Sequence, residues 1–545
     1  MSFSAASSLD ALFAPWTQIG SPGIALGLVQ HGHLVYAKGY GLANVEDNIP
    51  ITPSSVFHVA SVSKQFTAAL LLQLALDKKL SLSDDIHRFI PTLPHTETPI
   101  TLQHCLWHCS GFRDQWELLY LAGWRDGDLV RTDDIIRLLC RQHELNFVPG
   151  SQFCYCNSGY TLLGQVIEQV TGVSLRTYAQ DQLFRPLDMA HTFFQDDHTL
   201  TVPQRVIAYA PHADGHFRIC VPMFDTVGAT GLQTTVEDLA RWIAHLDTLY
   251  AGHAELLAQM LTPGTLSDGQ PLPYGAGLFL GTYRGYQTVS HTGSDYGYRA
   301  QVVWFPQRQE ALLLLCNLAT VPLRVLGQKV ADILLDEVKA VFPGEATSPV
   351  TQQKLFVAPT DLPDEAELLS LSGLYHHPAT EAVRRCVVID GQLMLHYGPG
   401  TRLCPIGPRH FRLEGTLLEL RFGLYPNGQR WLEEQDADGL VMRYDAVPEG
   451  HLTEEQFTSY IGLYTSDEVA TSYRIVLRDH TLFLLHDKFP PRLLTPTIQE
   501  SFWMEEDIRL CFTREADQVV GFFTWTHRVR HVFFKKQDAS LVRSE

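Results

Sequence analysis

The C-terminal third of the chain repeats itself, and this repeat restricts the folds that the region can adopt. The segment LSGLYHHPATEAVRRCVVIDGQLMLH aligns with YIGLYTSDEVATSYRIVLRDHTLFLLH at an offset of about 90 residues. The aligned positions include Tyr375 with Tyr464, Leu393 with Leu482, and Leu420 with Leu510. Both copies consist of short alternating segments with frequent turns and no long helical pattern. The repeat therefore predicts two small antiparallel β-barrels.

The preceding region has a mixed pattern of helices and strands. Residues 23–41, GIALGLVQHGHLVYAKGYG, predict two strands around a turn that contains glycine. Residues 287–319 again predict strands, and a closing helix is expected near Val321 to Val338. We expect strands from both ends of this region to share one antiparallel sheet.

The composition of one segment suggests where the domains separate. Residues 342–367 are rich in Pro, Thr and acidic side chains, which is typical of a linker. The predicted domains are therefore residues 1–345, a first barrel at 366–448 and a second barrel at 456–540. A chain of 545 residues is long enough for several domains of ordinary size.

Charge and composition exclude some classes of partner. The formal net charge of −19 argues against nucleic acid or an anionic membrane as a partner. No apolar run approaches the roughly 18 residues that span a bilayer. The first basic residue is Lys38, so the positive segment of a secretory signal is missing, and we expect a cytoplasmic location. The ten cysteines fit a reducing compartment in which they fill the core.

The first chemical signal is a lysine at the start of an apolar helix. In HVASVSKQFTAALLLQLA, Lys64 follows Ser61 by three residues, and it is the only one of ten lysines with a serine at that distance. A buried amine must have a partner or lose its proton. One helical turn apart, the two side chains lie close enough for the amine to share the hydroxyl proton. Ser61 is therefore the candidate nucleophile, although most Ser-x-x-Lys patterns are ordinary surface or cap sequences.

Two later segments supply the other groups that such a nucleophile needs. In FCYCNSGYTLL, Tyr155 and Asn157 precede a predicted helix, and their spacing directs both side chains to the same side of an extended loop. Tyr155 is the candidate second proton handler. In SHTGSDYGYR, His291 and Gly293 lie on a predicted strand, and the N–H of Ser294 is a candidate oxyanion donor.

Other clusters have simpler explanations. His104 and His108 have the i, i+4 spacing of metal ligands, but no third ligand is evident, and we expect them to pack beneath the site. Cys154 and Cys156 flank Tyr155, and core filling is favoured over a redox pair. We expect no metal and no organic cofactor.

The three motifs, in this order, resemble those of serine β-lactamases and penicillin-binding proteins. Four other segments extend the resemblance over roughly residues 15–340, and these are LQHCLWHCSGF, FVPGSQFCYCNSGY, PLDMAHT and GATGLQTTVEDLARW. The chain is most similar to the class C β-lactamase branch with its esterase and D-aminopeptidase relatives, peptidase family S12. The two trailing β-domains look like those of D-aminopeptidase.

The resemblance implies a multidomain α+β chain, in which a β-lactamase-like α/β sandwich with an antiparallel sheet is followed by two lipocalin-like barrels. It implies that Ser61 is acylated and that Lys64 and Tyr155 exchange its proton. The amides of Ser61 and Ser294 would hold the oxyanion beside Gly293. Asn157 and His291 would orient a small peptide, amide or ester. A homo-oligomer is compatible with the sequence.

The third motif bears on the substrate. Many members of the family have Lys where this chain has His291, and histidine is mostly neutral near pH 7. Substrates that end in a carboxylate therefore lose their anchor, which favours aminopeptidase, amidase or esterase chemistry over penicillinase or carboxypeptidase chemistry, and the resemblance points to D-aminopeptidase or amidase among these. An esterase, a peptide cyclase or transpeptidase, and a non-catalytic penicillin-binding or sensor protein remain alternatives.

A segment of the second barrel is a candidate substrate gate. The sequence LLHDKFPPRLL places Asp487 and Lys488 before Pro490-Pro491, and a loop of the final barrel enters the cleft in the D-aminopeptidase that the chain resembles. The alternative interpretation is a plain surface hairpin.

Overall fold

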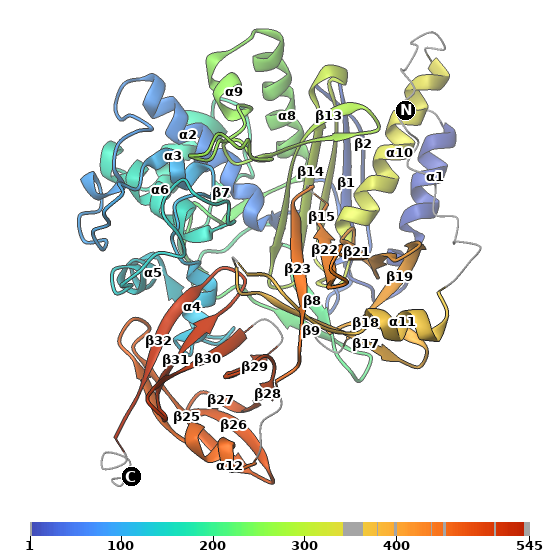
Figure 1. Cartoon of the computed structure of the whole chain (residues 1–545). Coiled ribbons are helices and arrows are strands. Elements are labelled where there is room, and N and C mark those ends of the chain that lie inside the picture. The colour runs from blue at the N-terminus through green and yellow to red at the C-terminus, as the bar shows by residue number, and fades with distance from the viewer. Residues whose placement is uncertain are drawn as a thin grey trace. The chain divides into compact units, whose positions relative to one another are not determined.

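The structure is a computed structural model with two compact units (Figure 1). It describes residues 3–341, 363–378, 380–396, 400–437, 439–450, 454–505 and 508–538. Most of the predicted linker, residues 342–362, lies outside these ranges. Unit 1 consists of Met1–Gly111, Asp126–Ile136 and Phe147–Gln353, and unit 2 of Phe112–Arg125, Arg137–Asn146 and Lys354–Glu545. Among the described residues, no helix is long and apolar enough to cross a bilayer.

Unit 1 is built on a six-stranded antiparallel sheet that joins both ends of the N-terminal region, as predicted. The strand order is β12 (Phe279–Tyr283), β13 (Tyr286–Asp295), β14 (Tyr298–Phe305), β15 (Glu310–Cys316), β1 (Ile24–Gln30) and β2 (His33–Tyr40). Ile24 pairs with Cys316 and Gln30 with Glu310, so the first and last central strands are neighbours. Every residue of β15 is buried, which explains its continuous run of apolar residues.

Helices cover both faces of this sheet. Helices α1 (Phe3–Phe13) and α10 (Leu323–Val341) pack together over one face, where Leu26 and Leu28 join their core (Figure 1). Helix α8 (Val236–Ala251) packs against β1, β2 and β15. The intervening Gly27 permits this packing, since a Cβ there would lie 2.3 Å from Val236 Cγ1.

The remaining helices of unit 1 form a second subregion. They are α2 (Lys64–Leu76), α3 (Leu102–Leu106), α6 (Asn157–Thr171), α7 (Leu175–Ala179) and α9 (Glu255–Met260), together with the first part of α5 (Thr132–Leu139), whose residues from Arg137 on belong to unit 2. Helix α2 contacts both α6 and α9. It is buried on all sides over its first nine residues, which agrees with the apolar sequence around it.

Unit 2 contains the two predicted antiparallel barrels. The first is closed, and its strands in order are β16 (Gly373–His376), β17 (Val383–Ile389), β18 (Gln392–Leu395), β19 (Thr401–Gly407), β20 (His410–Leu413), β21 (Glu419–Leu424), β22 (Arg430–Gln435) and β23 (Val441–Val447). The second is a nine-stranded sheet in the order β27 (Phe489–Leu493), β26 (Thr481–His486), β25 (Thr471–Arg478), β24 (Gly462–Ser466), β32 (Arg530–Lys536), β31 (Gln518–Trp525), β30 (Ile508–Glu515), β29 (Ser501–Glu505) and β28 (Thr495–Pro496).

Equivalent residues of the repeat have equivalent positions in the two barrels. Tyr375 and Tyr464 are both fully buried, and each hydroxyl donates to a carbonyl four residues earlier at 2.7 Å. Leu393 and Leu482 are each 1% exposed. The internal repeat predicted from the sequence is therefore confirmed at the level of the core.

The proline pair of the second barrel lies within a strand. Asp487 and Lys488 form the turn between β26 and β27, and Pro490-Pro491 belong to β27 at one end of the sheet order. Such an end strand tolerates proline because one side of its backbone needs no ladder partner. The segment is a β-hairpin, and the ring of Phe489 stacks on Tyr120 at a centroid distance of 5.5 Å.

Candidate active site

Ser61 lies in a tight turn that leads into a buried helix. Residues Ala60–Ser63 form a 3₁₀ turn, and α2 begins at Lys64. Side chains three residues apart eclipse in a 3₁₀ turn, and Lys64 Nζ lies 3.0 Å from Ser61 Oγ. Ala60 has a φ of 48°, a conformation that residues other than glycine rarely adopt. The turn therefore presents Ser61, which is partly exposed, above a fully buried lysine.

The partners of Lys64 have a chemical consequence. Besides Ser61, its Nζ donates to Asn157 Oδ1 and to the Ala229 carbonyl, each at 2.8 Å. Both of these oxygens are acceptors only. In its neutral form the amine uses its two N–H groups on them and directs its lone pair at the Ser61 hydroxyl. The arrangement suits an amine that removes a proton from Ser61.

The predicted pair Tyr155 and Asn157 lies beside Lys64. Asn157 is the first residue of α6 and is 6% exposed, which explains its fixed contact with the amine. Tyr155 precedes the helix in an extended segment and is partly exposed. Lys64 Nζ lies 4.9 Å from the centroid of the Tyr155 ring, within range of a cation–π interaction. The structure thus brings together four of the residues that the motifs single out.

His291 lies on β13 with both ring nitrogens engaged. Nδ1 lies 2.7 Å from the Thr292 carbonyl, which can only accept, so the proton is on Nδ1. Nε2 then accepts from the Tyr274 hydroxyl at 3.1 Å. Burial, with a smaller contribution from the charge of Lys64, lowers the pKa of His291 to about 3. His291 is therefore neutral at physiological pH.

Gly293 and Ser294 follow on the part of β13 that extends past β12. Strand β12 pairs only as far as Ser290, and the rest of β13 contacts the 3₁₀ turn of Ser61. A Cβ at Gly293 would lie 2.2 Å from the Val59 carbonyl oxygen, so only glycine permits this approach. Ser294 is exposed. The end of the strand therefore borders the turn that carries Ser61.

Two residues outside the three motifs also contact the site residues, and these are Tyr274 and His108. Tyr274 is fully buried and holds the ring of His291 through its hydroxyl. The ring centroid of His108 lies 4.2 Å from that of Tyr155, and its Nδ1 accepts the Cys156 N–H at 3.0 Å. Tyr274 has only a Tyr-Gly pair as a sequence signal, which is not specific, whereas His108 belongs to the i, i+4 pair that the sequence predicts to pack beneath the site.

The alternative roles of the nearby histidines and cysteines find no support in the contacts. His104 Nδ1 accepts the Thr101 N–H and so completes the cap of α3. His108 instead contacts the segment of Tyr155, through the Tyr155 ring and the Cys156 N–H. Cys154 and Cys156 form no disulfide bond. Neither pair is arranged as a ligand set or as a disulfide.

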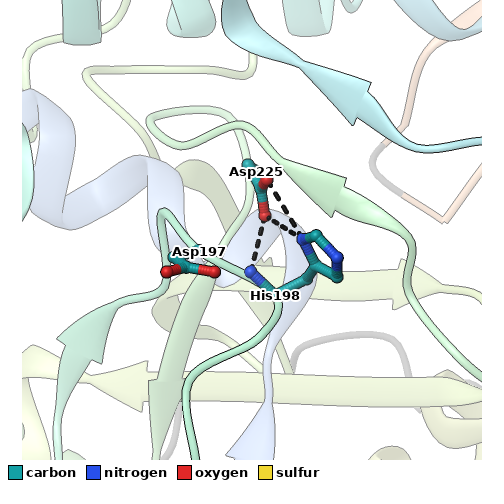
Figure 2. Close-up of side chains that lie close together, drawn as sticks. All are labelled: Asp197, His198 and Asp225. Atoms are coloured by element: carbon teal, nitrogen blue, oxygen red, sulfur yellow. Dashed lines mark hydrogen bonds and ion pairs between the residues drawn. The ribbon is translucent and has the colours of Figure 1, made fainter.

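A separate cluster joins a histidine to two carboxylates (Figure 2). Donor atoms of Asp197, His198 and Asp225 all lie within 4.8 Å of one another. The backbone N–H and Nδ1 of His198 both contact Asp225, at 2.6 and 2.9 Å. The Thr199 hydroxyl and N–H donate to Asp197, which lowers its pKa. These hydrogen bonds account for the cluster as a loop that is tied to β10 (Phe224–Asp225).

Comparisons with known sequences identify relatives of the first part of the chain. A family profile described as Beta-lactamase matches residues 9–335. A D-aminopeptidase from Gluconobacter oxydans (strain 621H) is 28% identical over 296 residues, which cover 54% of this chain and 56% of the relative. A D-aminopeptidase from Brucella canis is 28% identical over 283 residues, covering 51% and 53%. The chain spans about half the length of the curated relatives it matches.

Solved structures show the same fold. The octameric penicillin-binding protein homologue from Pyrococcus abyssi has a TM-score of 0.55 at 21% identity, covering 90% of this chain and 99% of that chain. The D-amino acid amidase from Ochrobactrum anthropi SV3 has a TM-score of 0.52 at 21% identity, covering 61% and 99%. Because the family profile covers more than half of the sequence, the chain belongs to the Beta-lactamase family.

Proposed function

We propose that the chain is a serine hydrolase that forms an acyl-enzyme on Ser61. The observation that carries the proposal is the buried amine of Lys64, held 3.0 Å from the Ser61 hydroxyl by two acceptor oxygens. The Ser61 oxygen attacks the substrate carbonyl, and its proton passes to Lys64 and Tyr155. The same groups return the proton to the leaving amine, and water then releases the acid.

The donors that stabilise the oxyanion belong to the proposal as well. We assign this role to the backbone N–H groups of Ser61 and Ser294, because the end of β13 borders the 3₁₀ turn. Gly293 keeps the two segments close, and Asn157 orients both Lys64 and the substrate. His291 is a positioning residue, since its two nitrogens are already engaged with Thr292 and Tyr274.

The proposed substrate class is a small amide or peptide with a D-residue at its amino end. The neutral, buried His291 gives no fixed cation for a substrate carboxylate. The curated relatives named D-aminopeptidase and the amidase structure support the same class. No cofactor is needed, since the nucleophile and its proton acceptors are side chains. We also retain the homo-oligomer as a prediction, which light scattering of the purified protein tests.

The test starts with a fluorescent fluorophosphonate on the wild-type chain and on Ser61→Ala. We expect one label per wild-type chain at Ser61 and none on the variant, while the variant keeps the wild-type thermal unfolding profile. D- and L-aminoacyl p-nitroanilides and p-nitrophenyl esters then identify the leaving group. We expect the D-aminoacyl anilides to have the highest kcat/KM.

Each other outcome has its own meaning. Equal activity of Ser61→Ala contradicts the proposal. Turnover of esters but of neither anilide indicates an esterase, and products longer or cyclic relative to the substrate indicate a transpeptidase or cyclase. Stoichiometric labelling by penicillin without release indicates a binding or sensor protein.

A further inference from the structure

Two segments of the N-terminal half are structural parts of unit 2. Phe112–Arg125 and Arg137–Asn146 belong to the same compact unit as Lys354–Glu545. The first contains α4 (Gln115–Leu121). Within unit 2, both segments contact the turn that joins β31 to β32, residues 526–529. We call this turn the clamp turn.

Asn146 connects the two segments to each other and to the second barrel. Its Nδ2 donates to the Arg528 carbonyl at 2.8 Å and to the Phe112 carbonyl at 3.4 Å. Its Oδ1 accepts the Arg530 N–H at 2.8 Å. The side chain is 7% exposed, and both N–H groups and the oxygen are in use. An alanine at this position removes one partner from each of three backbone groups.

The start of helix α4 also binds the clamp turn. The Arg528 guanidinium donates to Asp114 at 3.1 Å and to Glu117 at 2.8 Å, and its backbone N–H also donates to Glu117 at 2.8 Å. Asp114 in addition caps α4 by accepting the Trp116 N–H. The carboxylates that fix the start of the helix therefore also orient the turn, through charge-assisted hydrogen bonds.

A buried ion pair also ties these two segments to the second barrel. Arg113 donates to Glu468 at 2.5 Å and to Gln142 Oε1 at 2.8 Å. Glu468 also accepts the His143 N–H at 2.9 Å. Arg113 and Glu468 are 1% and 3% exposed, so neither charge has water as a substitute partner. The segments are thus fixed parts of unit 2.

Hydrogen bonds continue along the chain from these segments to the candidate site. The Cys109 carbonyl accepts the Gly150 N–H at 2.8 Å, and the His108 carbonyl accepts the Cys154 N–H at 2.9 Å. The residue after Cys154 is Tyr155. The stretches that lead away from Phe112 and from Asn146 therefore run side by side up to the proposed proton handler.

We propose that the clamp turn of the second barrel positions Tyr155 by fixing Phe112 and Asn146, where these two stretches begin. The inference rests on the proposed role of Tyr155 in proton transfer. The barrel contributes no reacting atom, but the reaction geometry depends on it. A misplacement of about 1 Å by a distant change costs on the order of 100-fold in rate.

The test compares Asn146→Ala with Tyr464→Phe in the full-length chain. Tyr464→Phe removes a buried hydrogen bond of the same barrel and leaves the clamp turn intact. Fluorophosphonate labelling measures the reactivity of the Ser61 nucleophile, since its oxygen displaces fluoride from phosphorus, p-nitrophenyl acetate measures turnover, and amide hydrogen exchange follows Gly150 and Cys154.

We expect Asn146→Ala to label roughly 10- to 100-fold more slowly than wild type, with the loss in kcat rather than in KM. Its Gly150 and Cys154 amides exchange faster. Tyr464→Phe stays within about twofold of wild type in all three measurements, because the clamp turn keeps its hydrogen bonds to Asn146 and Glu117.

Wild-type rates and wild-type exchange in Asn146→Ala overturn the proposal. A wild-type chain that does not label at Ser61 refutes the proposed function instead, and the exchange measurement still decides whether the clamp turn fixes the two stretches. If Asn146→Ala does not fold, Glu117→Gln replaces it, because it keeps the side-chain size and weakens the hold on Arg528. Unchanged labelling and exchange in Glu117→Gln then overturn the proposal.

Discussion

At the scale of single residues, His291 makes stability depend on pH. Its pKa is lowered from 6.5 to about 3 by burial, so the unfolded chain binds this proton more readily than the folded chain. The neutral residue therefore contributes stability that is complete above pH 6.5 and is lost as the pH falls toward 3.

We expect the free energy of unfolding of wild type to fall more steeply than that of His291→Gln, by up to about 1.4 kcal/mol per pH unit between pH 6 and 4. Urea unfolding of both proteins at pH 7, 6, 5 and 4 measures the difference. Parallel pH dependences would contradict the assignment of a buried, neutral imidazole.

Tyr274 gives a second prediction at this scale. Tyr274→Phe removes the hydroxyl that donates to His291 Nε2 and leaves that buried nitrogen without its donor. We expect a loss of about 1–3 kcal/mol in the free energy of unfolding. The matched control is Tyr283→Phe, which removes a hydroxyl bonded to Asp332 in a half-exposed setting. Equal losses in the two variants would show that the buried hydrogen bond between Tyr274 and His291 stabilises the fold no more than the half-exposed one does.

At the scale of elements, the contact between β13 and the 3₁₀ turn fixes the site. A Cβ at Gly293 meets the Val59 carbonyl, which belongs to the backbone and has no room to move as a side chain does. We expect Gly293→Ala to displace the strand from the turn and to slow labelling of Ser61 by more than about tenfold. Gly281→Ala on β12 is the control, because its nearest neighbour is a side-chain oxygen at 3.2 Å. Equal labelling rates in both variants would mean that the close approach of Gly293 to Val59 is not required for the reactivity of Ser61.

The elements also show how far sequence patterns reach. The repeat predicted both barrels because Tyr375 and Tyr464 face equivalent cores, and the apolar strands at both ends predicted the shared sheet. The Ser61–Lys64 pair was predictable because it is local. Tyr274 was not, since its contact with His291 depends on the packing of two segments that no short motif joins. The contact between Arg113 and Glu468 was not predictable for the same reason, because the two residues are 355 positions apart and no short motif joins them.

At the scale of the whole molecule, removal of the second barrel destabilises the N-terminal segments that it binds. Deletion of residues 448–545 removes Glu468, the buried partner of Arg113, together with the clamp turn that binds Asn146 and Glu117. We expect trypsin to cut the truncated chain after Arg125, Arg137 or Arg141 at least tenfold faster than the full chain. Cleavage after Arg308, in unit 1, serves as the internal control. A truncated chain as resistant as the full one would show that these segments fold without the barrel.

The hairpin hypothesis needs a smaller change for the same reason. Deletion of the barrel alters the segments of α4 together with the hairpin, so it does not isolate a gate. Replacement of residues 487–491 by Gly and Ser keeps Glu468 and Arg528 in place. If the hairpin selects substrates, bulkier aminoacyl anilides gain activity in this variant relative to small ones. An unchanged substrate profile would support the plain surface hairpin.

The long separation between Arg113 and Glu468 has a consequence for synthesis on the ribosome. A ribosome adds about 5–20 residues per second, so the 355 residues between the two partners take roughly 20–70 s to make. During that interval Arg113 and its neighbours have emerged without the strands that neutralise and cover them. The segments around Arg113 therefore lack Glu468 and the clamp turn until the second barrel has been synthesised, and over that interval water must solvate the polar groups that the barrel later binds.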